Sequence, residues 1–409
     1  MKLGIMSDLH LGLRQYGLRE RENDFYQQFD RAIDTFIQFN TDIIIIAGDI
    51  FDQPRPSPRA LDVFANGLNL LDQNNIAVYN IIGNHSMVQS KDFITADSFL
   101  EKITNYQLLD VDNFYENEDI FLSGLPYFYS SKIEELVECV NSLNQLAGKS
   151  TSKVKVLVLH QAFKEYCGFL GEDLSIHDLD ISNFDLVISG HIHQKLITDL
   201  EEGKVFLQPG SLERCNLAEA RDEENEGKGI FIIDTDRDIS AINVSDSFVR
   251  ISSDRKFLIA DMYINEEQDI EDMKSEILQK VSQYNLSPIL FLTVHDITGS
   301  FTRLLDITKD FNDVFLTVNF NYFDENLELK ANTIETDGVL SVREALKIAL
   351  NPLNEDEAKL GMDLYDSLKN DEDVQALLDD FFEKRKTKSK EDQTQNIDLE
   401  EMKNFFENL

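Results

Sequence analysis

The first twelve residues, MKLGIMSDLHLG (residues 1–12), contain a short apolar run that ends in two polar side chains. We expect residues 2–7 to form a buried strand, with Asp8 and His10 two residues apart at its end. A single Asp-x-His pair is common by chance, so it indicates a site only if other segments supply side chains that could act with it. Four further strand ends supply such side chains.

Apolar runs and helical patterns alternate along the first part of the chain. The run DIIIIAGD (residues 42–49) is rich in β-branched residues, which is typical of a strand buried on both faces. Residues 21–40 and 56–73 instead carry apolar side chains at helical spacing. Further strands are expected at residues 76–84, 153–160, 184–191, 204–210 and 229–234. The alternation predicts an α/β fold with a largely parallel sheet.

The chain has 409 residues, which is too long for one ordinary domain. We expect a first domain over residues 1–250 and a small α+β domain over 251–335. The remainder should comprise a helical region over 336–386, a polar, flexible linker over 387–396, and a short amphipathic helix over 397–409.

The composition is strongly acidic, with a formal net charge of -38, which argues against non-specific nucleic-acid binding. Residues 1–110 hold 9 basic and 15 acidic residues, a net charge of -6. This segment should therefore repel a polyanion less than the rest of the chain does. The three cysteines are far apart and form no C-x-x-C, which argues against a disulfide framework. No apolar run approaches the ~18 residues of a membrane helix. We therefore expect a soluble, intracellular protein.

Five of the expected strands are each followed by side chains that could bind a metal ion. They are Asp8 and His10 in SDLH, Asp49 in GDIFD, Asn84 and His85 in GNH, His160 in LHQ, and His191 and His193 in GHIH. Five of the seven histidines lie at these strand ends, a concentration that scattered structural histidines would not show. Because the carboxyl ends of parallel strands face one crevice, we expect these side chains to gather there.

Such a set of nitrogen and oxygen donors suits Mn²⁺, Fe²⁺ or Zn²⁺ better than Mg²⁺. The donors are too many for one cation, but two cations ~3.5–4 Å apart and bridged by a carboxylate would use them all. A pair of this kind produces hydroxide near neutral pH and neutralises a phosphoryl group during in-line attack. Glycines before Asp49, Asn84 and His191 allow the backbone to turn tightly beside the cations.

The ordered motifs D-x-H, G-D, G-N-H, H and G-H-x-H resemble those of the calcineurin-like metallophosphoesterase superfamily. Within it, the chain is similar to the Mre11/SbcD branch, a nuclease of DNA double-strand-break repair. The similarity lies in residues 7–29, 47–61, 158–163 and 208–214. It implies a metallophosphoesterase fold of central mixed, largely parallel β-sheets flanked by helices, with a small α+β capping domain and a helical C-terminal tail. It also implies a Mn²⁺-dependent DNA exonuclease and endonuclease.

The resemblance assigns roles to the motif residues one by one. Its metal ligands correspond to Asp8, His10 and His193 for one cation, to Asn84, His160 and His191 for the other, and to Asp49 as the bridge. His85 would not bind metal but would act as general acid or transition-state donor at the phosphoryl oxygens.

One residue departs from the family pattern. Ser86 stands where the family usually has an acid after the histidine of the third motif. A carboxylate there could orient His85 and raise its basicity, whereas a serine offers only a weaker hydrogen bond. We therefore expect metal binding to survive and turnover to be reduced.

The loop LRQYGLRER (residues 13–21) follows the first ligands, and in the family this loop helps to bind DNA. A basic side chain also follows the G-N-H motif. The expected DNA-contacting residues are therefore Arg14, Tyr16, Arg19, Arg21 and Lys91. The alternative is that the loop is only a solvated lead-in to a helix. Because the chain offers so few basic side chains to the phosphates, we expect the isolated chain to bind DNA weakly and with a steep salt dependence.

Helices near residues 58–73 form a dimeric four-helix bundle in the family. The apolar residues that would serve a homodimer here are Leu61, Phe64, Leu68, Phe93 and Phe99. The alternative is that these residues pack on the chain's own sheet.

The helical tail resembles the segment that grips the coiled-coil base of an SMC-like ATPase of the Rad50/SbcC type. The implied partners are therefore this ATPase, a second copy of the chain, and DNA double-strand ends and single strands. A cytoplasmic, nucleoid-associated location follows from them.

Two other functions remain open from the sequence. One is a phosphodiesterase that acts on a small nucleotide or RNA, which would need neither the tail helices nor a dimer. The other is a largely non-catalytic DNA-end tether with a structural metal site, for which Ser86 is the reason. Cleavage of a linear DNA duplex in Mn²⁺ distinguishes the nuclease from both.

Overall fold

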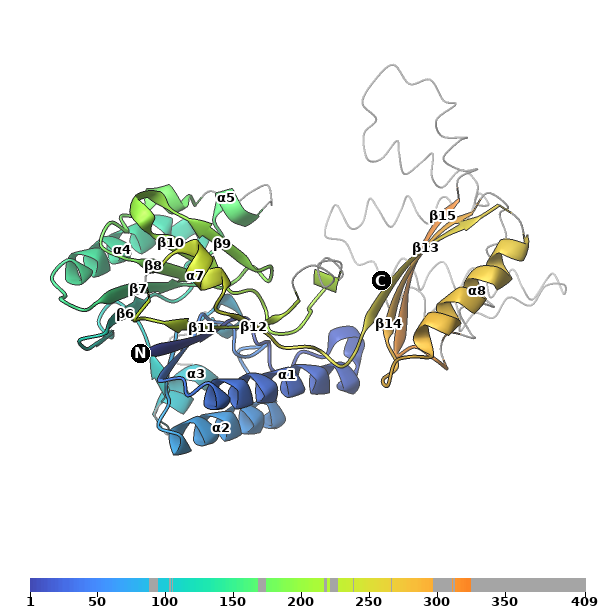
Figure 1. Cartoon of the computed structure of the whole chain (residues 1–409), viewed down its shortest axis with the longest axis horizontal. Helices are drawn as coiled ribbons and strands as arrows, with labels where there is room; N and C mark the ends of the chain where they lie inside the picture. The colour runs from blue at the N-terminus through green and yellow to red at the C-terminus, as the bar shows by residue number, and fades with distance from the viewer. Residues whose placement is uncertain are drawn as a thin grey trace, which may run out of the picture. The chain divides into compact units, whose positions relative to one another are not determined.

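The computed structural model describes residues 1–87, 95–102, 104, 106–167, 174–216, 219–220, 227–237, 239–265, 267–296, 311 and 313–324 (Figure 1). Residues 1–322 form one compact unit and residues 323–409 a second. The predicted segments 336–386, 387–396 and 397–409 lie outside the described residues.

The first sheet is built around the strand that opens the chain. Its order is β12-β11-β1-β2-β3-β4. The strands are β1 (Lys2–Met6), β2 (Ile43–Ile46), β3 (Ala77–Asn80), β4 (Tyr106–Leu108), β11 (Gly229–Asp234) and β12 (Phe248–Arg250). Strands β1 to β4 run parallel, whereas β11 pairs antiparallel with both β1 and β12. Strand β1 is therefore interior and paired on both sides.

The second sheet has the order β5-β6-β7-β8-β10-β9. Its strands are β5 (Tyr115–Glu116), β6 (Ile120–Gly124), β7 (Val154–Leu159), β8 (Leu186–Ser189), β9 (Leu196–Asp199) and β10 (Val205–Gln208). The four central strands are parallel, and an antiparallel strand closes each edge. Both sheets are thus mixed and largely parallel.

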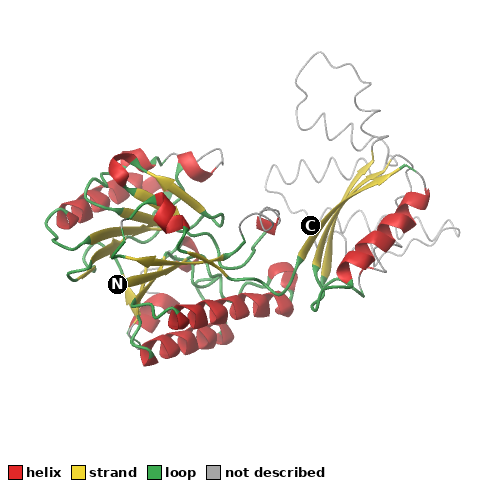
Figure 2. Ribbon diagram, viewed as in Figure 1, coloured by secondary structure: helices red, strands yellow, loops and turns green. Residues whose placement is uncertain are grey.

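Helices cover the outer face of each sheet. Helices α1 (Arg19–Gln38) and α2 (Pro58–Gln73) lie side by side against the first sheet (Figures 1 and 2), and α4 (Ile133–Ala147) covers the second. A third apolar cluster, which includes Ile5, Ile45 and Val156, fills the space between the sheets. The result is four layers in the order helix, sheet, sheet, helix. Short helices α3 (Ala96–Glu101), α5 (Lys164–Cys167) and α7 (Ala241–Ser245) join the strands.

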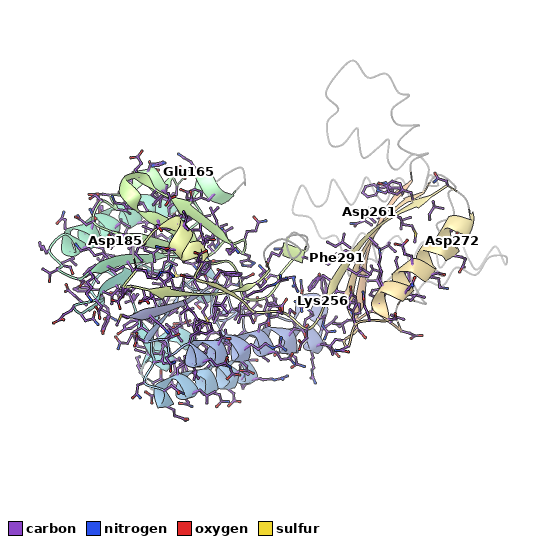
Figure 3. The ribbon with its side chains drawn as sticks, in the orientation of Figure 1. Glu165, Asp185, Lys256, Asp261, Asp272 and Phe291 are labelled. Carbon is purple, nitrogen blue, oxygen red and sulfur yellow. The ribbon has the colours of Figure 1, made fainter. Side chains whose placement is uncertain are left out.

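A third sheet follows these layers in the chain. It has the order β13-β14-β15, with β13 (Phe257–Ile264), β14 (Ile289–Asp296) and β15 (Thr317–Asp324). Helix α8 (Glu267–Val281) contributes to the same apolar cluster as this sheet; Figure 3 shows Asp272 on the helix and Phe291 on the sheet. The described part of residues 251–335 therefore combines a sheet with a helix, as an α+β domain does.

The fold class expected from the sequence is confirmed, and each expected strand of the first 250 residues is present. Strand β6 and helix α4 were not predicted, although both contribute fully buried side chains to the core. Among the described residues, no helix is long and apolar enough to cross a membrane.

Candidate metal centre

The carboxyl ends of five parallel strands deliver the predicted ligands to one place. Strand β1 precedes Asp8 and His10, β2 precedes Asp49, and β3 precedes Asn84. The second sheet adds His160 after β7 and both His191 and His193 after β8. Since these strands are parallel within each sheet, their ends lie at one edge of the two stacked sheets.

One half of the centre is formed around the amide of Asn84. Its Oδ1 lies 3.0 Å from Nε2 of His160 and 2.8 Å from Nδ1 of His191. Nε2 of His160 also lies 3.1 Å from Oδ2 of Asp49. The Nδ1 atom of His160 is 2.7 Å from the carbonyl oxygen of Ala47, so that nitrogen donates and Nε2 faces the cluster.

The other half contains Asp8, His10 and His193. The Nε2 atoms of the two histidines are 3.0 Å apart. Asp8 is fully buried, and both of its carboxylate oxygens accept from the backbone amide of His191, at 3.1 and 3.2 Å. Nδ1 of His10 is buried and has no hydrogen-bond partner among the described residues.

Asp49 belongs to both halves. A ligand oxygen of its carboxylate lies within 4.8 Å of ligand atoms of Asp8 and His10. A ligand oxygen also lies within 4.8 Å of ligand atoms of His160 and His191. A carboxylate shared by two clusters is the geometry of a bridging ligand. The facing imidazole nitrogens, the orphaned Nδ1 of His10 and the shared carboxylate together fit two divalent cations, with these residues as the donors.

Burial and neighbouring charges set the protonation of the histidines in the metal-free protein. Burial, reinforced by His193, lowers the pKa of His10 to about 3, and burial with His160 nearby lowers the pKa of His191 to about 4. Burial also opposes the charged form of His160, but the Asp49 carboxylate outweighs it and raises the pKa to about 9. The pKa of Asp49 is correspondingly lowered. Two of these imidazoles are therefore neutral donors already at neutral pH.

The backbone at the centre is held in a sparsely populated conformation. Asp8, His10, Asp49 and His191 have φ values of 51°, 44°, 49° and 83°, in the left-handed region that residues with a side chain seldom adopt. Each such residue costs of order 1–3 kcal/mol and persists only where the surrounding structure imposes it. Here the flanking sheet strands impose it, which is characteristic of a preformed site.

Glycines bring the backbone close to the ligands, as the sequence predicted. A Cβ atom on Gly83 would lie 2.1 Å from Oδ1 of Asp49, and one on Gly48 would lie 2.3 Å from Nδ1 of His160. A Cβ on Gly190 would lie 2.1 Å from the carbonyl oxygen of Ala47. A side chain at any of these positions would displace a ligand or its support.

His85 lies beside the ligand cluster, and 38% of its side chain is exposed. Its ring centroid is 4.7 Å from that of His10, and its backbone amide donates to Oδ1 of Asp49 over 2.9 Å. Nδ1 of His85 lies 2.7 Å from the backbone carbonyl oxygen of Asp52. Because a carbonyl oxygen only accepts, Nδ1 carries the proton and Nε2 is left for a substrate.

The expected hydrogen bond from Ser86 to His85 is not formed. Ser86 is 2% exposed, and its side chain hydrogen-bonds to the buried Asp97. The carbonyl of Asp52 orients His85 instead, from a different loop. The replacement of the usual acid by serine therefore leaves His85 with a fixed orientation.

Sequence reasoning missed the residues that support the ligand His193. Oε1 of Glu219 lies 2.9 Å from Nδ1 of His193, and its other oxygen accepts from Lys228 Nζ over 2.6 Å and from Ser211 Oγ over 2.8 Å. The residue is 3% exposed, and the hydrogen bond from His193, together with the charge of Lys228, outweighs burial and lowers the pKa of Glu219 to about 2. The only signal for it was its place just after the QPGSLER motif.

The expected DNA-contacting residues differ in their exposure to solvent. Tyr16 is 39% exposed, Arg19 is exposed, and half of the Arg14 side chain is exposed. Arg21 is fully buried, where it bonds Gln15, Asp24 and the carbonyl of Arg214, so its assignment to DNA was wrong. Helix α1 turns this side chain inward although the residues before it face solvent. Lys91 lies outside the described residues.

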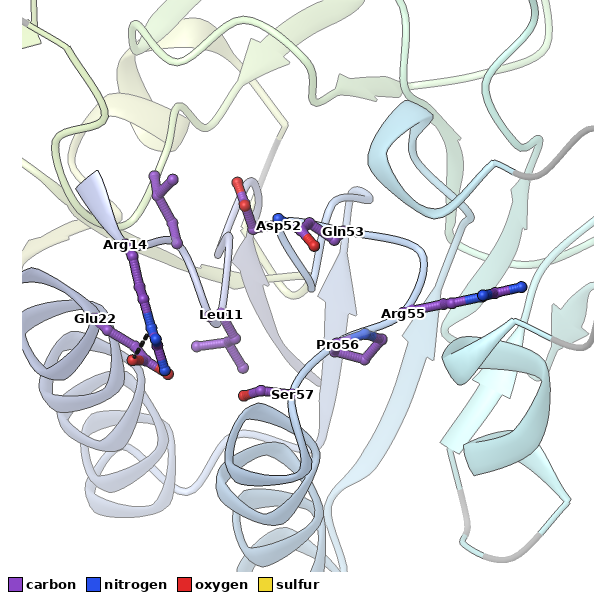
Figure 4. Close-up of a pocket in the computed structure, with 10 residues that line it drawn as sticks. Leu11, Arg14, Glu22, Asp52, Gln53, Arg55, Pro56 and Ser57 are labelled. Carbon is purple, nitrogen blue, oxygen red and sulfur yellow. Dashed lines mark hydrogen bonds and ion pairs between the residues drawn. The ribbon is translucent and has the colours of Figure 1, made fainter. Parts of the chain in front are cut away.

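A pocket of about 550 Å³ opens between the first two motif loops (Figure 4). Arg14 and Arg55 both line it, and so do Glu22 and Asp52. Nε of Arg14 is 2.7 Å from Oε2 of Glu22 across one wall. Asp52 is also the residue whose carbonyl orients His85, so the pocket adjoins the candidate catalytic group.

Two of the expected dimer residues are part of the core. Phe64 is 0% and Leu68 is 1% exposed, and both pack in the apolar cluster between α2 and the first sheet, so their assignment to a dimer was wrong. Leu61 packs partly against the same cluster. Phe99 on α3 is 51% exposed, and Phe93 lies outside the described residues.

Comparisons with known proteins agree with this centre. Residues 1–195 match the family described as calcineurin-like phosphoesterase. The chain is 30% identical over 387 residues to the "DNA double-strand break repair protein Mre11" of Methanocaldococcus jannaschii, covering 92% of this chain and 97% of that protein. The protein of the same description from Methanococcus maripaludis is 29% identical, with 92% and 98% covered. That from Saccharolobus solfataricus is 26% identical over 378 residues, with 91% and 96% covered.

Proposed function

Because this chain belongs to the Mre11 family of DNA double-strand break repair proteins, we propose that it is a nuclease that hydrolyses DNA phosphodiester bonds at a two-metal site. The chain is a metal-dependent phosphoesterase by family, and DNA as its substrate is what the relatives' description supports. The observation that carries the proposal is the convergence of seven donor residues on one edge, with Asp49 shared between two clusters.

The proposed mechanism assigns each half of the centre to one cation. Asp8, His10 and His193 would hold the first; Asn84, His160 and His191 would hold the second; Asp49 would join them. Two such cations supply a hydroxide near neutral pH and neutralise charge on the phosphoryl oxygens. The mixture of imidazole, amide and carboxylate donors favours Mn²⁺ as the working cation, with Fe²⁺ or Zn²⁺ as possible replacements.

His85 would handle the proton of the reaction. Hydrolysis breaks the bond between phosphorus and the leaving deoxyribose oxygen, and that oxygen needs a proton as it leaves. Nδ1–H donates to the carbonyl of Asp52, so in the imidazolium form of His85 it is Nε2–H that would give its proton to the leaving oxygen or hydrogen-bond to a phosphoryl oxygen. Partial exposure of the ring is consistent with this role, because a substrate must reach it.

We place the approaching DNA over the pocket beside Asp52. Arg14 and Arg55 line that pocket and would neutralise phosphates on either side of the scissile bond. Tyr16 and Arg19 are exposed on the following turn, where a base or sugar could stack, and Lys91 remains a further proposed contact. Both exonuclease and endonuclease cleavage are proposed, on double-strand ends and on single strands.

The proposed assembly includes further chains. We propose a homodimer through the surface that exposes Phe99, with Leu61 and Phe93 as further contacts, and a Rad50/SbcC-type ATPase bound through residues 336–409. The net charge of -38 supports an external supplier of DNA-binding charge, since the chain itself repels a polyanion. Its place of action would then be the nucleoid.

The decisive experiment combines metal analysis with a cleavage assay on a linear duplex. Purified chain, with and without the ATPase, is assayed in Mn²⁺ or Mg²⁺, and bound cations are counted. The proposal expects two cations per chain and cleavage that needs Mn²⁺. Hydrolysis of small nucleotides with no cleavage of any DNA would favour the small-substrate phosphodiesterase. DNA binding and complex assembly with no turnover in Mn²⁺ would favour the tether.

A further inference from the structure

Cys215 lies next to the half of the metal centre that contains His10 and His193. One ring nitrogen of each histidine and the Sγ atom of Cys215 are all within 4.8 Å of one another. The five motifs that supply the proposed ligands contain no cysteine, and nothing in the sequence pattern places Cys215 beside them. The cysteine is therefore a potential donor that the proposed set of seven ligands does not use.

The fold holds the backbone of Cys215 from two sides. Its amide donates to Oε2 of Glu219 over 3.3 Å, and its carbonyl accepts from Nε2 of Gln15 over 2.9 Å. Gln15 is in turn held by the buried Arg21, whose Nε donates to it over 2.8 Å. These hydrogen bonds fix the position of the cysteine backbone.

The carboxylate of Glu219 forms hydrogen bonds with both this cysteine and the neighbouring metal ligand, His193. Oε1 of Glu219 holds Nδ1 of His193, while Oε2 holds the amide of Cys215. The other histidine of the group, His10, is 2% exposed and has a buried Nδ1 with no hydrogen-bond partner among the described residues. The sulfur contacts the carbonyl oxygen of Glu213 over 3.6 Å, and the thiol also forms a hydrogen bond with the side chain of His193. The thiol and the two imidazoles therefore lie together beside the place where a cation is expected.

We propose that Cys215 is an additional, thiolate donor to the cation held by Asp8, His10 and His193. The inference rests on the proposed two-metal site. When the sulfur binds the cation, the thiol proton passes to solvent and one S–metal bond forms, with no change in oxidation state. Because thiolate is a soft donor, this half of the centre should bind Zn²⁺, Co²⁺ or Fe²⁺ in preference to Mn²⁺ more strongly than an oxygen and nitrogen site would.

The test is a Co²⁺ titration of the full-length, metal-free protein followed by absorption spectroscopy. Bound Co²⁺ gives visible d–d bands with any ligand set, whereas a near-ultraviolet thiolate-to-Co²⁺ charge-transfer band requires a sulfur ligand. The matched variants are Cys215→Ser and the control Cys139→Ser, on helix α4. Far-ultraviolet circular dichroism checks that both variants are folded.

We expect visible bands in all three proteins and the charge-transfer band in the wild type and Cys139→Ser but not in Cys215→Ser. Competition titrations should also show Zn²⁺ binding weakened roughly tenfold or more by Cys215→Ser, with Mn²⁺ binding nearly unchanged. Visible bands without a charge-transfer band in the wild type would overturn the inference and leave the two-metal function intact. A charge-transfer band that survives Cys215→Ser would also overturn it. A wild-type protein that binds no Co²⁺ would instead contradict the two-metal function itself.

Discussion

Glu219 orients His193: its Oε1 lies 2.9 Å from Nδ1 of the imidazole, whose Nε2 faces His10. The carboxylate fixes which nitrogen of His193 carries a proton and turns the other toward the metal cluster. Lys228 and Ser211 hold the carboxylate in turn, so the ligand is supported by a buried polar chain.

Replacing Glu219 by Gln should weaken metal binding without removing any ligand. Loss of a carboxylate partner to a metal-bound histidine typically costs about 10–100-fold in affinity. Isothermal titration with Mn²⁺ measures the change, and Glu135→Gln, on the exposed face of α4, is the control. Equal affinities for Glu219→Gln and Glu135→Gln would show that Glu219 does not support the centre.

Replacing His85 by Ala should abolish most cleavage while leaving the fold and the metal content unchanged. General acid catalysis typically contributes about 10²–10⁴-fold to the rate, and His85 binds no metal in the proposed scheme. Cleavage rates on a linear duplex and metal counts measure the two effects. His177→Ala, at an exposed position, should behave like the wild type. Loss of bound metal in His85→Ala would mean that His85 is a ligand.

Replacing Gly83 by Ala should disrupt the bridge between the two halves of the centre. The new Cβ would lie 2.1 Å from Oδ1 and 2.5 Å from the amide nitrogen of Asp49, so the carboxylate or its backbone must move. We expect destabilisation of about 1–3 kcal/mol and a clear loss of the second bound cation. Denaturant unfolding and metal counting measure these two results.

The control for that variant is Gly203→Ala, a glycine with open space around it and a φ of 77°. It should cost about 1–2 kcal/mol through its left-handed backbone alone and leave metal binding unchanged. If Gly203→Ala lost metal as readily as Gly83→Ala, general destabilisation and not contact with Asp49 would be the cause.

The metal-free protein should lose stability as the pH falls below 6.5. Burial lowers the pKa of His10 to about 3 and that of His191 to about 4, whereas an unfolded histidine titrates near 6.5. Across this window the unfolded state gains protons that the folded state does not, at up to about 1.4 kcal/mol per pH unit for each histidine. The pKa of His160, about 9, gives a contribution that is fully present below 6.5 and lost only as the pH rises through 9.

Thermal unfolding in a chelator, followed across this pH window, measures the effect. His10→Asn should flatten the dependence, because one of the two histidines is removed, and the exposed His177→Ala should not. Stability that stays constant or rises toward acid pH would mean that these imidazoles are not held neutral in the folded chain.

Replacing Arg14 by Ala should weaken DNA binding uniformly across sequences and reduce the salt dependence. One lost phosphate contact lowers the slope of log affinity against log salt by about 1. Fluorescence anisotropy over a salt series measures the slope, with Lys132→Ala beside α4 as the control. The metal content should be unchanged, since Arg14 pairs with Glu22 and not with a ligand. An unchanged slope would remove Arg14 from the DNA path.

The fold and the metal ligands were predictable because both depend on short-range patterns. Strand-end residues such as Asp49 and His160 follow runs of buried β-branched residues, and parallel strands bring such ends together. Strand β6 and helix α4 were missed although they are as well buried, since neither carries a motif that drew attention to it.

The errors share a different cause, namely side-chain direction on a helix or turn. Arg21 and Arg19 are neighbours in sequence, yet only Arg19 faces solvent. Phe64 fits an exposed or an inward helical stripe equally well from spacing alone. Glu219 contacts His193 through tertiary structure, and no periodicity announces a bond across that distance in sequence.

The pairing of β1 with β11 has a consequence for how the protein is made. During synthesis, strand β1 stays unpaired along one side until residues 229–234 are available to pair with it. The amino-terminal ligands also wait for His191 and His193. A growing chain therefore lacks its full set of metal ligands until His193 has been translated, and it can complete the sheet that carries the amino-terminal ligands only when residues 229–234 follow.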